Sequence, residues 1–201
     1  VQYNPAATVF TATTLGVGAI TYTFDADIAA NTTLLAATGF NATLLGFFQM
    51  SGDVAIKKSF ETVKINDGTG DIDVDVDVLT IGGHNVSAFA GLNGGTAEEF
   101  GLTLSGVDFG LAMLSDALDD ARNWLSLQAS ATGVTFTGVT GLTLSASNVS
   151  VEINQAANDA SLVNYATQSL TVATGPATDI TLTMDAADGE LLRASGTLNL
   201  N

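Results

Sequence analysis

Four aspartates alternate with aliphatic residues in one short segment, and carboxylates with this spacing could bind a cation. Successive side chains of a β-strand point to opposite faces, so Asp71, Asp73, Asp75 and Asp77 would share one face. The intervening Ile and Val residues would then face a core. Calcium is the expected ion, because it is a hard cation that takes oxygen ligands.

The geometry of a single strand limits this prediction. Carboxylates two residues apart are about 6.8 Å from each other, whereas calcium–oxygen distances are about 2.3–2.6 Å. A specific site would therefore need the loop at Asn66, Asp67 and Gly68, or oxygens from a neighbouring strand or subunit. The alternative is a solvated acidic face, since two charges at this distance in water repel by only about 0.6 kcal/mol. The candidate metal ligands are Asp67, Asp71, Asp73, Asp75 and Asp77.

Few other residues could do chemistry. The single histidine, His84, lies between glycines and Asn85, which is typical of a turn or a strand edge. A Ser-His-Asp triad would have to use it, and the sequence contains no Gly-x-Ser-x-Gly motif. There is no cysteine and no zinc-ligand spacing, and no phosphate-binding Gly-x-x-x-x-Gly-Lys motif. We therefore expect no catalytic residue and no enzymatic activity.

The net charge of the chain indicates which classes of partner it can bind. The chain has 201 residues, of which 21 are acidic and 5 basic, for a net charge of -16. Five cations cannot neutralise a run of phosphates, so nucleic acid is not an expected partner. No stretch approaches 18 consecutive apolar residues, so no membrane-spanning helix is expected. Acidity without cysteine favours a secreted, extracellular or cell-surface protein, and the start of the sequence indicates a processed or excised segment.

Alternation of apolar and polar residues dominates the chain and predicts many strands. It is clear at 20–24, 134–137, 149–153 and 180–184, with turn residues between such segments. The predicted fold class is all-β, as an elongated repeat architecture that is β-solenoid-like or built of stacked curled sheets, with a β-sandwich as the alternative. The segment 114–125 could form a short helix capped by Ser115, or an exposed turn between two strands.

Internal repeats are the most informative feature of the chain. Residues 1–7 (VQYNPAA) match 151–157 (VEINQAA), and residues 34–39 (LLAATG) match 191–196 (LLRASG). A shorter match relates 101–109 to 141–149. The two long-range matches have nearly the same offset and the same order. They predict one complete β repeat unit at 1–150 and the opening third of a second unit at 151–201.

Several segments resemble the tandem units of very large secreted bacterial repeat proteins of the adhesin and calcium-binding type. They are GFFQMSG at 46–52, SAFAG at 87–91, GVDFGLA at 106–112, WLSL at 124–127 and GELL at 189–192. These are packing motifs, and they are distributed over most of the length of 34–201. The resemblance implies a secreted, multi-repeat, β-rich polymer segment and supplies no catalytic residue.

The expected function is therefore structural. The chain is predicted to be a repeat segment of a bacterial surface, fibre or matrix protein that assembles with copies of itself or with adjacent repeats. The alternative is a calcium-dependent adhesin module that binds a glycan or a cell-surface protein. In that case the loops 92–99 and 114–123 would carry the contacts.

Overall fold

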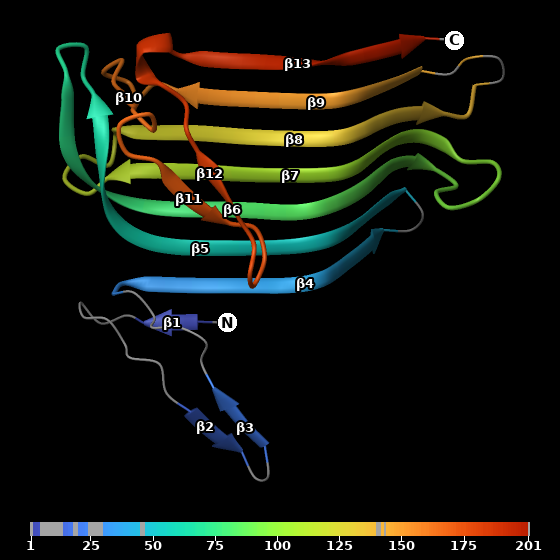
Figure 1. Ribbon diagram of the computed structural model, residues 1–201, viewed down its shortest axis with the longest axis horizontal. Helices are drawn as coiled ribbons and strands as arrows, with labels where there is room; N and C mark the ends of the chain where they lie inside the picture. The colour runs from blue at the N-terminus through green and yellow to red at the C-terminus, as the bar shows by residue number, and fades with distance from the viewer. Residues whose placement is uncertain are drawn as a thin grey trace.

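A computed structural model describes residues 2–4, 14–17, 20–23, 30–44, 47–139, 142 and 144–200. The all-β prediction is confirmed: the described residues form long antiparallel strands and no α-helix. One large open sheet runs through the molecule, and the segment between its last two strands lies across one face (Figure 1).

The sheet is an antiparallel meander. Its strands, in spatial order, are β1 (Gln2–Asn4), β4 (Thr32–Leu44), β5 (Phe48–Asn66), β6 (Asp71–Leu92), β7 (Phe100–Asp116), β8 (Asn123–Thr137), β9 (Leu144–Gln155) and β13 (Leu191–Leu200). From β4 to β9, strands adjacent in sequence are adjacent in space, as expected when two-faced strands are joined by short turns. Figure 1 also shows the β5–β6 hairpin curling at one end of the sheet.

The turns between strands contain side chains that form hydrogen bonds with nearby backbone groups. Between β5 and β6, Asp67 Oδ1 accepts the N–H groups of Thr69 (2.8 Å) and Gly70 (3.2 Å). Gly68 has a φ of 90°, a conformation that favours glycine. Residues 117–122 form the turn between β7 and β8, so of the two interpretations of 114–125 the turn is correct and the helix is wrong.

Residues 156–190, which we call the covering segment, form the second layer. The segment contains β10 (Leu162–Val163), which pairs with β5, the hairpin of β11 (Leu170–Ala173) and β12 (Asp179–Leu182), and the short 3-10 helix η1 (Ala186–Asp188). Its apolar residues pack on alternate residues of β5 to β8. The resulting core includes Val63, Ile65, Val76, Val78, Ala112, Leu114, Trp124, Val163, Tyr165, Leu170, Val172, Leu182 and Met184.

The two ends of the sheet have the same order of elements. β1 is followed by the hairpin of β2 (Thr14–Val17) and β3 (Ile20–Thr23) and then by β4, which pairs with β1. Likewise β9 is followed, after the two-residue strand β10, by the β11–β12 hairpin and then, after η1, by β13, which pairs with β9. The two pairings differ in register by two residues: Asn4 faces Thr32, whereas Asn154 faces Leu191. A two-residue difference preserves the face that each side chain takes.

Candidate functional site

The aspartates of β6 take the predicted face. Asp73, Asp75 and Asp77 are exposed, while Val76 and Val78 between and beside them are fully buried against the covering segment. The alternation seen in the sequence therefore places the carboxylates on the face of the sheet that the covering segment leaves free. We call this side the uncovered face.

Strand β5 supplies a partner to each of these three carboxylates. Lys64 Nζ lies 2.8 Å from Asp73 Oδ1, and Lys58 Nζ lies 3.6 Å from Asp77 Oδ1. The Thr62 hydroxyl donates a 2.6 Å hydrogen bond to Asp75. The repulsion within the ladder is thus offset by two of the five cationic side chains of the protein.

Asp71 and Asp67 have other surroundings. Asp71 accepts hydrogen bonds from Asn164 Nδ2 (2.8 Å) and from the Thr167 hydroxyl (2.8 Å), which joins the start of β6 to the covering segment. The Asn164 hydrogen bond is the main reason why the pKa of Asp71 is lowered. Hydrogen bonding from Thr69 likewise lowers the pKa of Asp67 in its turn.

The five predicted ligands are therefore divided between a strand face, a turn and a contact between layers. Within the described part of the chain, no group of three or more His, Cys, Asp or Glu side chains is arranged to hold a metal ion. Calcium binding stays a prediction, and it would require oxygens beyond those of one strand.

His84 lies at a β-bulge of an interior strand rather than at a turn or edge. The pairing of β6 with β7 shifts between Gly83 and Val86, and Asn85 has a φ of 48°. Asp108 Oδ1 lies 2.8 Å from His84 Nδ1 and accepts the Asn85 N–H at 2.8 Å. Asp108 therefore satisfies the irregular backbone of the bulge, a pairing that sequence spacing alone could not reveal.

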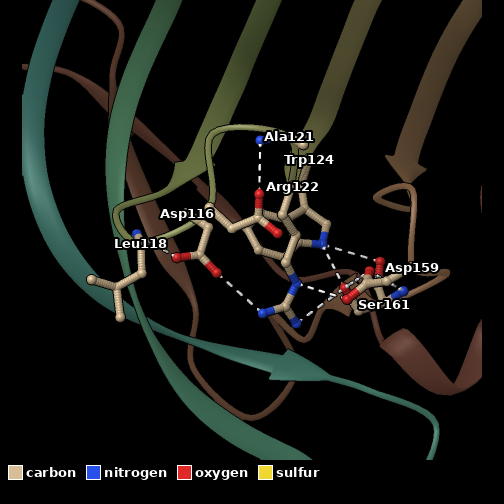
Figure 2. Close-up of polar contacts among 8 residues, drawn as sticks. Asp116, Leu118, Ala121, Arg122, Trp124, Asp159 and Ser161 are labelled. Carbon is tan, nitrogen blue, oxygen red and sulfur yellow. Dashed lines mark hydrogen bonds and ion pairs between the residues drawn. The ribbon is translucent and has the colours of Figure 1, made fainter.

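A second polar cluster fastens the β7–β8 turn to the covering segment (Figure 2). The Arg122 guanidinium lies 3.1 Å from Asp116 Oδ2 and 2.8 Å from Asp159 Oδ2, and its centre is 5.0 Å from the centre of the Trp124 ring. Trp124 Nε1 donates to the Ser161 carbonyl at 3.0 Å. The Ser161 hydroxyl donates to Asp159, which is the main reason why the pKa of Asp159 is lowered. The Arg122–Asp159 and Trp124–Ser161 contacts join 116–124 to 159–161.

Aliphatic side chains cross the whole uncovered face in one line, which we call the aliphatic row. Each member is the direct register partner of the next, over seven strands from β4 to β13. The row consists of Leu35, Ile56, Ile81, Leu111, Leu127, Ile153 and Leu192. The four residues from Ile81 to Ile153 are half-buried by their neighbours, whereas Ile56 is 43% exposed, and Leu35 and Leu192 at the two ends are 51% and 80% exposed.

A hollow of about 510 Å³ lies beside the row. Leu79, Met113 and Leu125 contribute apolar side chains to it, and Lys58 and Gln155 contribute polar ones. The sequence did carry a signal for this face. Consecutive apolar residues such as Met113 and Leu114 lie within strands, and such pairs put apolar groups on both faces.

The fold and these sites define an open antiparallel β-sheet protein with one covered face and one uncovered face, which carries both the carboxylates of β6 and the aliphatic row. No family model, curated protein or solved structure matches the chain. Among the residues that the structure describes, no helix has the length and hydropathy needed to cross a bilayer.

Proposed function

We propose that the chain is a structural repeat segment of a secreted bacterial surface, fibre or matrix protein, in which successive repeats extend one β-sheet. The observation that supports this most strongly is the recurrence of one order of elements along the chain at both ends of the sheet. A strand, a hairpin and a pairing strand occur as β1, β2–β3 and β4, and again as β9, β11–β12 and β13.

The repeat in the sequence coincides with this recurrence. Thr14 and Leu170, which begin the first strands of the two hairpins, are 156 residues apart. The matching segments at 34–39 and 191–196 lie in β4 and β13 and are 157 residues apart. In the proposed repeat, β13 has in the second unit the place that β4 has in the first. A sheet in which β13 is followed by strands like β5 to β9 would repeat without changing its architecture.

Such a sheet has a calculable repeat length. One repeat contributes six strands to the sheet, β4 to β9, because the next strand, β13, is the equivalent of β4. With about 4.8 Å between neighbouring strands, each repeat would lengthen the sheet by about 29 Å. The aliphatic row would run along the full length of this fibre, because each of the sheet strands β4 to β9, and β13 after them, contributes one member to it.

Electron microscopy of chains with two, four and six tandem repeats tests the proposal. We expect rods of constant width whose length increases by about 29 Å for each repeat. Particles that grow in all directions, or separate beads on a flexible string, would contradict a continuous sheet.

A calcium-dependent adhesin module is the second candidate. It is favoured by the position of Asp73, Asp75 and Asp77, which are exposed together on the uncovered face. A glycan array probed with and without a chelator tests it. Calcium-dependent retention of one glycan class is expected, and equal signals under both conditions would contradict it.

A further inference from the structure

We infer that the outer edge of β13 pairs with a strand of the β5 sequence that belongs to the next repeat of the same polypeptide. The inference rests on the proposed function and adds the partner strand and its register. Its evidence is the comparison of β13 with β4, the strand at the equivalent place in the first unit.

The pairing of β4 supplies the register. In the structure β4 lies between β1 and β5, with Leu35 opposite Ile56 and Ala37 opposite Val54. Residues 34–39 of β4 match 191–196 of β13, so Leu192 takes the place of Leu35. The equivalent arrangement sets Leu192 opposite Ile56 of the next repeat, antiparallel, on the uncovered face.

The exposure of β13 indicates what is missing beside it. Leu192 pairs with Ile153 of β9 on one side and is 80% exposed, and Leu35 pairs with Ile56 of β5 on one side and is 51% exposed. Every residue from Leu192 to Leu200 is exposed. A strand with the β5 sequence would extend the aliphatic row by one member and cover the side of Leu192 that now faces solvent.

The edge also lacks the usual protection against pairing. Edge strands of self-contained domains are commonly blunted by Lys or Pro residues. Between Leu191 and Leu200 the single charged residue is Arg193, and its guanidinium forms an ion pair with Glu152 on β9. The outer edge of β13 is therefore free of charges that would oppose a further strand.

The next repeat is a better partner than a second folded copy of this chain. In a folded copy, β5 is hydrogen-bonded to β4 on one side and to β6 on the other. That copy would have to release its own β4 before it could accept β13. In a tandem polypeptide β13 itself takes the β4 place, so the β5 strand that follows it has one side open.

An extended chain tests the register directly. Residues 1–201 are followed by a second copy of 45–201, which includes its own covering segment and preserves the offset because Asn201 is then the equivalent of Leu44. The protein has no cysteine, so Leu192→Cys in the first unit and Ile56→Cys in the second form one defined pair. Directly opposed residues of antiparallel strands are about 4.5–5.5 Å apart at Cα, which is within disulfide reach.

The matched control replaces Phe60→Cys in the second unit instead of Ile56. Phe60 and Ile56 are similarly exposed, at 45% and 43%, but position 60 lies four residues along the strand, about 13 Å away. We expect the 192–56 pair to oxidise at least about tenfold faster than the 192–60 pair. We also expect the β13 amides to exchange about tenfold more slowly with deuterium than in the 201-residue chain.

Two results would overturn the inference. One is a 192–60 cross-link that forms as fast as the 192–56 cross-link. The other is deuterium exchange of the β13 amides that is equally fast in the 201-residue chain and in the extended chain, although circular dichroism shows that the added strands are folded. The proposed function is judged separately by rod length. If rods lengthen with each repeat but the 192–56 cross-link does not form, only the inferred register is rejected. If the cross-link forms but no rods are seen, only the proposed fibre is rejected.

Discussion

The Ser126 hydroxyl donates a hydrogen bond of 3.0 Å to the side-chain carbonyl of Asn154 across β8 and β9, and both side chains are fully buried. Asn154 Nδ2 in turn donates to the Val163 carbonyl at 3.0 Å, and the Tyr165 hydroxyl donates to Ser126 Oγ at 2.9 Å. Burial raises the pKa of Tyr165 far above its ordinary value, although the hydrogen bond to Ser126 opposes the shift. This buried network ties the covering segment to the sheet.

Replacing Asn154 should loosen the covering segment. Asn154→Ala leaves the Val163 carbonyl and the Ser126 hydroxyl without their partner in a fully buried site. We expect the free energy of unfolding to fall by about 2–4 kcal/mol. Urea unfolding followed by Trp124 fluorescence measures the change. The control, Asn199→Ala on exposed β13, should stay within about 0.5 kcal/mol of the wild type. Equal effects of the two variants would contradict a stabilising role of the network.

Two arginines offer a matched test of the Asp116–Arg122–Asp159 cluster. The Arg122 side chain is 16% exposed, and its removal would leave the nearly buried carboxylate of Asp116 unpaired. The Arg193 side chain is 58% exposed in its pair with Glu152. We expect Arg122→Ala to lower the free energy of unfolding by about 3 kcal/mol and Arg193→Ala by less than about 1 kcal/mol.

Thermal unfolding of both variants checks this prediction. Arg122→Ala should also alter the emission spectrum of Trp124, because the guanidinium lies against the indole ring. Arg122→Lys should recover only part of the lost free energy of unfolding. The planar guanidinium contacts both carboxylates, whereas the single ammonium of lysine cannot do so. Equal destabilisation by Arg122→Ala and Arg193→Ala would show that the cluster contributes no more than a surface ion pair.

Acid should weaken the attachment of the covering segment. The pKa values of Asp71 and Asp159 are lowered in the folded protein by hydrogen bonds from Asn164 and Ser161 respectively. A lowered carboxyl pKa stabilises the fold above the pKa of the unfolded chain, near 4, and this stabilisation disappears as pH falls through the folded-state value. The melting temperature of the wild type should therefore drop below about pH 4.

Asp71→Asn isolates one of these carboxylates. The melting temperature of the wild type should exceed that of Asp71→Asn at pH 6, and the difference should shrink as the pH is lowered toward 3. Asp120→Asn, on the exposed β7–β8 turn, serves as the control and should follow the wild type throughout. A difference between wild type and Asp71→Asn that is constant with pH would show that the Asp71 charge does not contribute.

The sequence predicted the strands better than their assembly. Period-two alternation placed Val76 and Val78 opposite Asp75 and Asp77, because side-chain direction in a strand is a local property. It did not predict the partners of the carboxylates. The contact of Asp71 with Asn164 joins residues 93 positions apart, and such contacts depend on how the layers pack. The β-bulge at His84 was missed for the same reason, since its carboxylate partner belongs to the next strand.

The two faces of the sheet should respond differently to truncation. Leu114 is 2% exposed beneath the covering segment, whereas Leu127 is half-buried in the aliphatic row. Leu114→Ala should lower the free energy of unfolding by about 2–5 kcal/mol through loss of packing and formation of a cavity. Leu127→Ala should lower it by about 1 kcal/mol, because solvent can occupy the vacated space. Chemical denaturation compares them, and a loss with Leu127→Ala as large as with Leu114→Ala would indicate that the uncovered face is buried in solution.

Calcium titration tests the metal prediction on Asp73 and Asp75. An ion bound there must displace the Lys64 ammonium from Asp73 and the Thr62 hydroxyl from Asp75, so binding should compete with these contacts. A specific site predicts saturable heat at millimolar calcium in a calorimeter, lost in the Asp73→Asn, Asp75→Asn double variant. It also predicts tighter binding in Lys64→Met, where the competing cation is gone. Heat that never saturates, and that is unchanged in all three proteins, would identify the ladder as a solvated acidic face that the β5 side chains already balance.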